Sequence, residues 1–147
     1  MIKPNEYYKG FCIRDVCHAV KTKKREEAVR YIADWYVNTG EIDGRCTLIP
    51  VPQHTGKAEY TLEICQLIQK STGCYISDVL RSIPHKSLYE QKRKQSKQLY
   101  TGLYNIGNIV TNQRVFLIDN VVATGLTMKD CVELIPSAIP FAFAEVR

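Results

Sequence analysis

The sequence has no apolar run near the ~20 residues that a bilayer-spanning helix requires, and its first ten residues, MIKPNEYYKG, lack the apolar centre of a secretory signal. It also has no low-complexity tract and no repeat of fixed period, which excludes fibrous, solenoid and compositionally disordered classes. We therefore expect a cytoplasmic protein that does not bind membranes.

Metal-binding and disulfide patterns are also missing, although the chain has six cysteines. Cys12 and the pair Cys17-His18 form the only close set, and no second pair at zinc-finger spacing completes four ligands. Because nothing marks secretion, the thiols are expected to be reduced. Cys46 and Cys65 lie in apolar stretches and are expected in the core. No zinc is expected.

What is present is an ordinary globular composition. The 147 residues are 45% hydrophobic and 24% charged, a size and composition typical of one compact domain. We expect a single domain over residues 1–147.

Hydrophobic spacing predicts strands that alternate with helices. Helical spacing occurs in three segments, and short apolar or β-rich runs occur in five. The expected helices are Arg25–Val37, Ala58–Lys70 and Thr127–Ile135, and the expected strands are Cys46–Val51, Cys74–Leu80, Tyr100–Ile106, Arg114–Asp119 and Pro140–Val146. This order predicts an α/β fold, a parallel sheet with helices on both faces and a ligand site at the carboxyl ends of the strands.

Positive charge gathers in one segment. The formal net charge is +5. The segment from Arg81 to Lys97 contains six Lys or Arg residues and a single acidic residue, Glu90. The segment carries Pro84 and has weak periodicity, so we expect a long functional loop. Such a charge favours an anionic partner, either a phosphate metabolite or nucleic acid.

The segment VFLIDNVVATGLTM, residues 115–128, has the clearest chemistry. A buried strand leads to Asp119, and a loop with Thr124, Gly125 and Thr127 precedes a helix. Backbone N–H groups at such a turn and helix start bind phosphate, glycine allows the turn, and an acid accepts sugar hydroxyls or holds Mg²⁺. The alternative is an ordinary strand, turn and helix with Thr127 as the N-cap.

This stretch resembles the phosphoribosyl-diphosphate signature of type I phosphoribosyltransferases, which reads acid, acid, hydrophobic, any, Thr, Thr, Gly, any, Thr. Similarity to the competence-protein (ComF-like) branch continues in LIPVPQH at 48–54, LRS at 80–82, the basic linker and the turn at Gly102. The resemblance covers about residues 46–146. It implies a core at 46–147, an N-terminal arm and helix at 1–45, and a mobile basic hood loop at 81–99.

The resemblance also implies a set of site residues. Asp119 and Asn120 would be the catalytic pair at the ribose, and Asp119 would meet Mg²⁺ indirectly or through the ligand. The 5-phosphate would be bound by Ala123, Thr124, Gly125, Leu126 and Thr127, and pyrophosphate by residues from Pro52, Gln53, His54, Lys57, Lys86 and Arg93. In this family the hood and the N-terminal region select the acceptor base, and dimers are common, so a homodimer is expected.

Three features depart from the family. Asn120 replaces the usual second acid, which removes a negative charge beside the ribose, and Ala123 replaces a threonine hydroxyl. The paired-cysteine zinc module of the competence type is missing.

Two functions follow from these residues. The first is an enzyme that moves ribose 5-phosphate between phosphoribosyl diphosphate and a nitrogenous base, with Mg²⁺ and without a nucleophile. The second is a non-catalytic module that binds a nucleoside monophosphate in the same pocket, or serves a nucleic-acid process. Asn120 favours the second, and direct nucleic-acid binding is the less favoured form of it. His18, His54 and His85 are interpreted as surface or capping residues.

Overall fold

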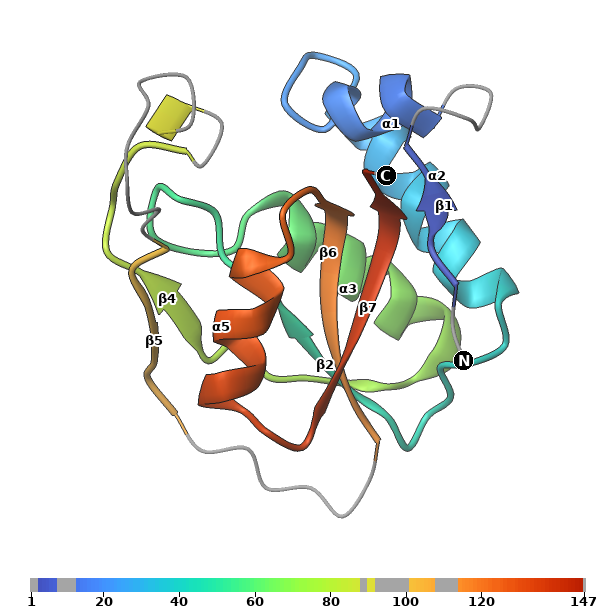
Figure 1. Ribbon diagram of the computed structural model, residues 1–147. Coiled ribbons are helices and arrows are strands. Elements are labelled where there is room, and N and C mark those ends of the chain that lie inside the picture. Colours follow the sequence, from blue (N-terminus) through green and yellow to red (C-terminus); the bar gives the residue numbers. More distant parts are fainter. Residues whose placement is uncertain (1–2, 8–12, 88–89, 92–100, 108–113, 147) are drawn as a thin grey trace.

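A computed structural model describes residues 3–7, 13–87, 90–91, 101–107 and 114–146 (Figure 1). Five strands form one parallel sheet in the order β1-β7-β6-β2-β3. These strands are β1 (Asn5–Glu6), β2 (Thr47–Pro50), β3 (Tyr75–Ile76), β6 (Val115–Val122) and β7 (Ala138–Glu145). A separate antiparallel pair consists of β4 (Leu80–Ser82) and β5 (Leu103–Asn105). The helices described are α1 (Ile13–Ala19), α2 (Arg25–Asn38), α3 (Tyr60–Thr72) and α5 (Leu126–Leu134).

Helices cover both faces of the large sheet. Figure 1 shows α5 in front of the strands and α2 and α3 behind them. Alternate residues of β6 divide between two cores, since side chains in a strand point to opposite faces. Phe116 and Ile118 pack with α1, α2 and α3, whereas Val115 and Leu117 pack with α5. The buried strand predicted here is therefore present, and both of its faces are apolar.

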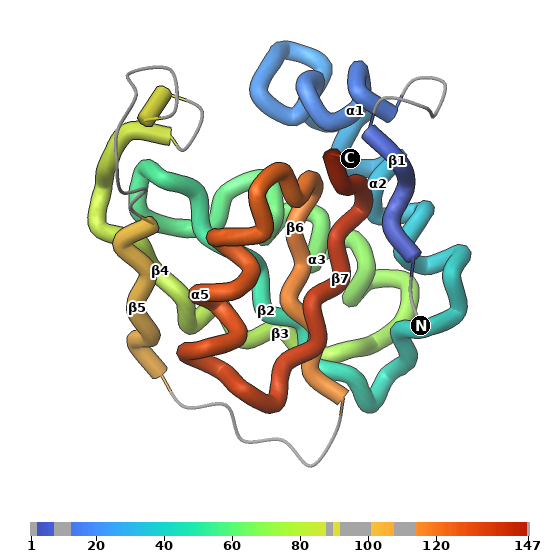
Figure 2. The backbone as a smooth tube through the Cα atoms, viewed as in Figure 1, coloured from blue at the N-terminus to red at the C-terminus, as the bar shows by residue number. Residues whose placement is uncertain are grey.

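The small sheet lies beside α5, away from β7 (Figure 2). Leu80 of β4 is fully buried and, with Leu103 of β5, packs in the same core as α5. Arg81 pairs in register with Tyr104 across the two strands. The small sheet therefore forms a side wall next to the carboxyl ends of the large one.

The connections of the large sheet run in opposite directions from its middle. From β2 the chain passes through α3 to the outer strand β3, whereas from β6 it passes through α5 to β7. Right-handed crossovers in opposite directions place α3 and α5 on opposite faces. The order reverses between β2 and β6, and ligands of open α/β sheets bind at such a point, beyond the carboxyl ends of the strands.

The α/β architecture predicted from the sequence is confirmed, with three differences in detail. The expected strand 74–80 is only Tyr75–Ile76 in the large sheet, because Leu80 already belongs to β4. The strand expected to end at Asp119 continues to Val122, because β7 pairs with it to that residue. Neither α1 nor β1 was expected, and β1 pairs with β7 from the opposite end of the chain.

All five cysteines in the described residues are free and buried. Cys46 and Cys65 are therefore in the core, as predicted. Cys12 lies outside the described residues. Among the described helices, none combines the length and the apolar character of a membrane span.

Candidate functional site

A cleft of about 320 Å³ lies at the carboxyl ends of β2 and β6, where the strand order reverses. Its lining residues come from the end of β6, the start of α5, the turn after β2, the start of α3, the small-sheet wall and the α1–α2 turn. They are Lys21, Val51, Pro52, Gln53, His54, Tyr60, Ser82, His85, Ser87, Thr101, Leu103, Asp119, Asn120, Val121, Val122, Ala123, Thr124, Gly125, Thr127 and Met128. The cleft brings together most of the residues that the sequence singled out.

The cleft opens because β6 is longer than its neighbour. The last hydrogen bond between β2 and β6 runs from the Val51 N–H to the Ile118 carbonyl, at 3.0 Å. Pro52 follows and cannot donate to a ladder, so the chain leaves the sheet there. From Asp119 onwards β6 is paired on the β7 side, and its other side borders the cleft.

Asp119 is partly buried at the base of the cleft. Its Oδ1 accepts the backbone N–H of Asn120 at 2.8 Å. Burial raises the pKa of this carboxyl from 3.8 to about 7, although the Asn120 N–H and the positive charge of Lys21 act in the opposite direction. Asp119 can therefore present either a hydrogen-bond acceptor or a neutral acid near neutral pH.

Asn120 borders the cleft but is bonded to the N-terminal segment. The residue is 3% exposed, and its Nδ2 donates to the Cys17 carbonyl of α1 at 3.4 Å. Burial, followed by the charge of Asp119, raises the pKa of the Cys17 thiol to about 12, so this thiol stays neutral. The amide therefore fixes α1 against β6 at the site.

The loop after β6 has the form of an anion-binding turn. Gly125 is the N-cap of α5 with φ +81°, a conformation that favours glycine, and a Cβ there would meet nothing within 4 Å. The Thr124 Oγ1 accepts the Leu126 N–H at 3.1 Å, which fixes the turn. Thr127 lies inside the first turn of the helix, so it is not the N-cap. Ala123 and Thr124 are exposed at the mouth.

The turn after β2 forms the opposite side of the cleft. The Gln53 N–H donates to the Lys57 carbonyl at 3.2 Å, and the Gly56 N–H donates to the Gln53 carbonyl at 3.1 Å. Gly56 has φ +134°, which again favours glycine. Pro52, Gln53 and His54 line the cleft, whereas Lys57 is exposed and does not.

Two other residues expected at pyrophosphate are not among the lining residues. Lys86 is exposed beside Ser87, and its carbonyl accepts the Gln91 Nε2 at 2.7 Å. Arg93 lies outside the described residues, as does most of the expected hood loop. Their role at pyrophosphate stays a prediction.

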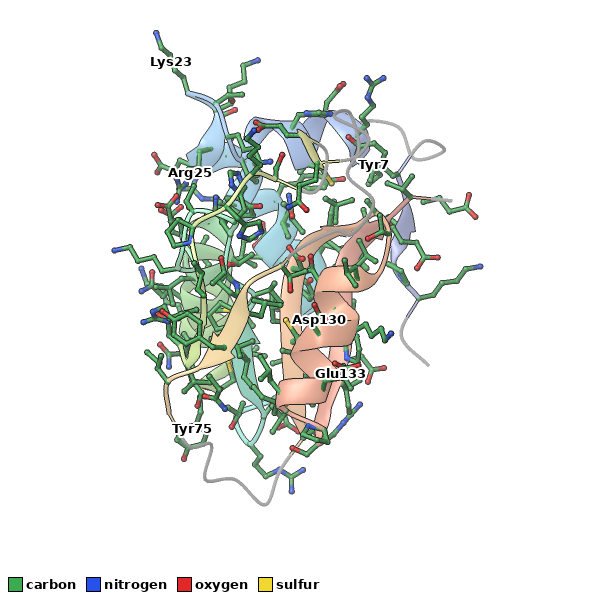
Figure 3. All side chains as sticks on the ribbon, turned by 60° about the vertical axis from the view of Figure 1, so that its left-hand side comes forward. Tyr7, Lys23, Arg25, Tyr75, Asp130 and Glu133 are labelled. Atoms are coloured by element: carbon green, nitrogen blue, oxygen red, sulfur yellow. The ribbon has the colours of Figure 1, made fainter. Side chains whose placement is uncertain are left out.

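Sequence reasoning missed Lys21, His85 and Thr101 as parts of the site. Lys21 follows α1 in a turn with no motif of its own, and it reaches the cleft only because α1 packs beside β6. Thr101 donates to Asp130 Oδ2 at 2.6 Å, which joins the chain before β5 to α5, where Figure 3 labels Asp130. The pairing of β4 with β5 and the bond from the His85 N–H to the His54 carbonyl help to bring His85 and Thr101 to the site, and no local pattern shows either contact.

The donor set determines what metal could be held here. Asp119 is the single carboxylate among the described lining residues, and one of its oxygens already accepts an N–H. No three His, Cys, Asp or Glu side chains in the described parts of the chain are grouped as metal ligands. These residues fit a Mg²⁺ ion that arrives on the oxygens of a ligand, because Mg²⁺ often keeps waters and uses one carboxylate with substrate phosphates.

No protein-family model and no curated protein sequence matches this chain. Solved structures do. A hypoxanthine phosphoribosyltransferase from Staphylococcus aureus matches with a TM-score of 0.51 and 15% identity, over 82% of this chain and 73% of that one. The allosteric regulatory enzyme of purine biosynthesis matches with a TM-score of 0.50 and 12% identity, over 80% of this chain. This chain spans only 25% of the length of that enzyme. At these identities the likeness concerns the fold, and the chain has the type I phosphoribosyltransferase fold.

Proposed function

We propose that the chain binds phosphoribosyl diphosphate or a nucleoside 5′-monophosphate in this cleft and transfers ribose 5-phosphate between diphosphate and a nitrogenous base. The observation that carries the proposal is the meeting of Asp119 and the 123–127 loop in one cleft at the end of β6. An acceptor for sugar hydroxyls beside a set of anion-binding donors suits a sugar phosphate.

The loop from Ala123 to Thr127 would hold the 5-phosphate. The N–H groups of Thr127 and Met128 are in the first turn of α5, where no helical carbonyl accepts them. The positive end of the α5 dipole and the Thr127 hydroxyl add to the attraction of an anion. The Thr124 hydroxyl helps mainly by fixing the turn, since it already accepts the Leu126 N–H.

Asp119 would hold the ribose. As a carboxylate it accepts hydrogen bonds from two hydroxyls, and its negative charge stabilises positive charge that develops on the sugar during transfer. Its partly buried position makes that charge more effective than it would be in water. Lys21 lies on the same cleft and would offset the charge of the bound phosphates.

The transfer itself needs positioning more than acid–base chemistry. The bond between ribose C1 and the diphosphate oxygen breaks, and its electron pair leaves with that oxygen. A nitrogen of the base bonds to C1, and its proton passes to solvent. Asp119 and the loop hold the sugar at two points, so that C1 is presented to both groups.

A Mg²⁺ ion, when bound with the ligand, would neutralise the diphosphate and make it a better leaving group. Asp119 would meet it through the ligand or a water, as the single lining carboxylate of the described residues.

A second candidate is a non-catalytic module that keeps the pocket and binds a nucleoside monophosphate. One observation favours it: the amide of Asn120 donates to the Cys17 carbonyl instead of offering a second charge to the ribose. Binding of nucleic acid would instead show a steep loss of affinity with salt, because several phosphates would release counterions.

Calorimetric titration with phosphoribosyl diphosphate, with and without Mg²⁺, tests the proposal beside ribose 5-phosphate and nucleoside monophosphates. Diphosphate binding that strengthens with Mg²⁺, and transfer to one of a panel of bases, is the expected result. Binding of monophosphates alone would favour the second candidate, and binding of none of these ligands would show both to be wrong.

A matched pair of variants tests the site. Asp119→Asn should weaken ribose 5-phosphate binding by about 10- to 100-fold, because a hydrogen bond to a charged group is lost. Asp34→Asn removes an exposed carboxylate on α2 and should leave the affinity unchanged. If the two variants bind ribose 5-phosphate with equal affinity, Asp119 does not contact this ligand.

A further inference from the structure

Tyr60 is a buried residue whose position at the cleft is fixed by its neighbours. It is the first residue of α3, is 8% exposed, and packs in the core that α1, α2 and α3 form with the sheet. The hydroxyl of the next residue, Thr61, donates to the Val51 carbonyl just after β2, at 2.7 Å. One turn further along α3, Arg25 of α2 donates to both oxygens of Glu63, at 2.8 and 3.0 Å. These contacts hold the tyrosine ring at the edge of the cleft, which it lines.

The hydroxyl of Tyr60 has no partner within the protein. A buried tyrosine usually gives its O–H to a protein acceptor or to water. In the parts of the chain that the structure describes, no group forms a hydrogen bond with the Tyr60 hydroxyl, although the residue is more than nine-tenths buried. Burial, followed by the charge of Asp119, raises the pKa of this hydroxyl, so it keeps its hydrogen. The cleft therefore contains a neutral donor that the fold does not use.

Asp119 brings an acceptor to the same cleft. Its Oδ1 accepts the Asn120 N–H, whereas no group among the described residues donates to its Oδ2. The Asp119 carboxylate is near enough to Tyr60 for its charge to act on the tyrosine hydroxyl, yet no hydrogen bond joins the two described side chains. A donor and an acceptor thus lie at one cleft, and each can still bond to a ligand.

A hydroxyl is the ligand group that suits both side chains. Its oxygen accepts from Tyr60, and its hydrogen goes to the carboxylate of Asp119. A phosphate oxygen also accepts from the tyrosine, but the carboxylate repels it. A base nitrogen that carries a hydrogen donates to the carboxylate, but it does not accept from the tyrosine. The ring hydroxyls on C2 and C3 of a ribose therefore fit this pair better than either end of the ligand does.

We propose that Tyr60 is a further ligand-binding residue, which donates to a ribose ring hydroxyl whose own hydrogen goes to Asp119. The inference rests on the proposed function, since it assumes that ribose 5-phosphate occupies this cleft. Asn120 brings no second carboxylate, and its Nδ2 donates to the Cys17 carbonyl, so the tyrosine supplies another polar contact to the sugar. The contact also selects the sugar, because a sugar that lacks this hydroxyl leaves both Tyr60 and Asp119 without their partner.

Three sugar phosphates test this proposal: ribose 5-phosphate, 2-deoxyribose 5-phosphate and 3-deoxyribose 5-phosphate. Calorimetry would measure the affinity of each for wild type and for Tyr60→Phe. The variant should bind ribose 5-phosphate about 3- to 10-fold more weakly, because one hydrogen bond is lost. For one of the two deoxy sugars the same substitution should change the affinity by less than about twofold, since that sugar lacks the hydroxyl that Tyr60 binds. The sugar that shows this small change identifies which hydroxyl is bound.

Tyr75→Phe is the matched control. Tyr75, which Figure 3 labels, is 63% exposed and pairs in register with Thr47 at the amino ends of β3 and β2, away from the carboxyl ends that form the cleft. This variant should bind all three sugars as wild type does. Urea denaturation of the free protein should give Tyr60→Phe the same midpoint as wild type, because the ring still packs and the lost hydroxyl had no protein partner.

The outcomes separate this inference from the proposed function. If wild type binds ribose 5-phosphate and Tyr60→Phe binds all three sugars equally well, Tyr60 does not contact the sugar, and the proposed function stands without it. An equal loss with all three sugars, with or without a lower urea midpoint, would also overturn the inference, because neither ring hydroxyl would then be the partner of Tyr60. If wild type binds none of the three sugars, the proposed function fails, and this inference fails with it.

Discussion

The Tyr36 hydroxyl lies 2.8 Å from the backbone carbonyl of Asp119 and 2.6 Å from that of Phe141. Tyr36 belongs to α2, is fully buried, and packs edge to face on Phe141 with ring centroids 4.7 Å apart. The two carbonyls belong to β6 and β7, next to each other in the sheet. One hydroxyl therefore connects a helix on the far face to the residue at the base of the cleft.

Replacement of Tyr36 by Phe tests this connection. The ring would still pack, but two carbonyls would lose their shared donor in a buried place, at a cost of about 1–3 kcal/mol in the free energy of unfolding. Urea denaturation measures the cost. Tyr31→Phe is the matched control, because Tyr31 is on the same helix and 50% exposed. Equal stabilities of the two variants would show that the hydroxyl contributes nothing.

The raised pKa of Asp119 predicts how stability changes with pH. Its carboxyl titrates near pH 7 when folded and near 3.8 when unfolded. Between these values the unfolded chain has lost the proton and the folded chain keeps it, so ionisation favours unfolding. The contribution of Asp119 to stability is therefore fully present below pH 3.8 and is lost as the pH rises through 7. The free energy of unfolding should fall by as much as about 4 kcal/mol over this range.

Asp119→Asn removes this titration while keeping an oxygen that can accept the Asn120 N–H. The variant should gain stability relative to wild type as the pH rises from 4 to 8, although it binds ribose 5-phosphate less well. Denaturant midpoints across this range, beside those of Asp34→Asn, measure the difference. If the difference in denaturant midpoint between wild type and Asp119→Asn stays constant with pH, Asp119 ionises as an exposed carboxyl does.

Gly125 and Gly40 offer a matched comparison of backbone strain. Both have positive φ, +81° and +73°, and a Cβ at either would meet nothing within 4 Å. Alanine at either position should cost about 1–2 kcal/mol of stability from the conformation alone. Only Gly125→Ala should also weaken ribose 5-phosphate binding, because its turn holds the phosphate. If both variants bind ribose 5-phosphate equally well, the turn at Gly125 does not hold the phosphate.

Much of the fold could be predicted from local pattern, because its central elements carry clear periodicity. Helices α2, α3 and α5 begin and end within two residues of the expected segments. Strand β6 was the clearest apolar run, and its following loop has the turn that Thr124 and Gly125 indicated. These features depend on residues close together in the sequence, which is why they could be found.

The missed features depend on pairing between distant residues. Strand β1 has two residues, and its register with Ala144 and Glu145 leaves no pattern in so short a segment. Lys21 and His85 reach the cleft through the packing of α1 and the pairing of β4 with β5. The contact of the Asn120 amide with the Cys17 carbonyl joins residues 103 positions apart, so no local pattern shows it.

Asn120→Asp restores the acid that the family signature has, but the surroundings of this residue predict a cost. The new carboxylate would be buried and would face the Cys17 carbonyl, an acceptor, in place of an amide that donates to it. At pH 8 we expect a loss of about 2–4 kcal/mol in stability and no gain in any transferase rate. At pH 5 the protonated acid can donate to the carbonyl, so the loss should be small. Asn105→Asp, on exposed β5, should show neither effect. A faster transfer with unchanged stability would instead mean that residue 120 faces the ribose during the reaction, and that loss of its charge limits this chain.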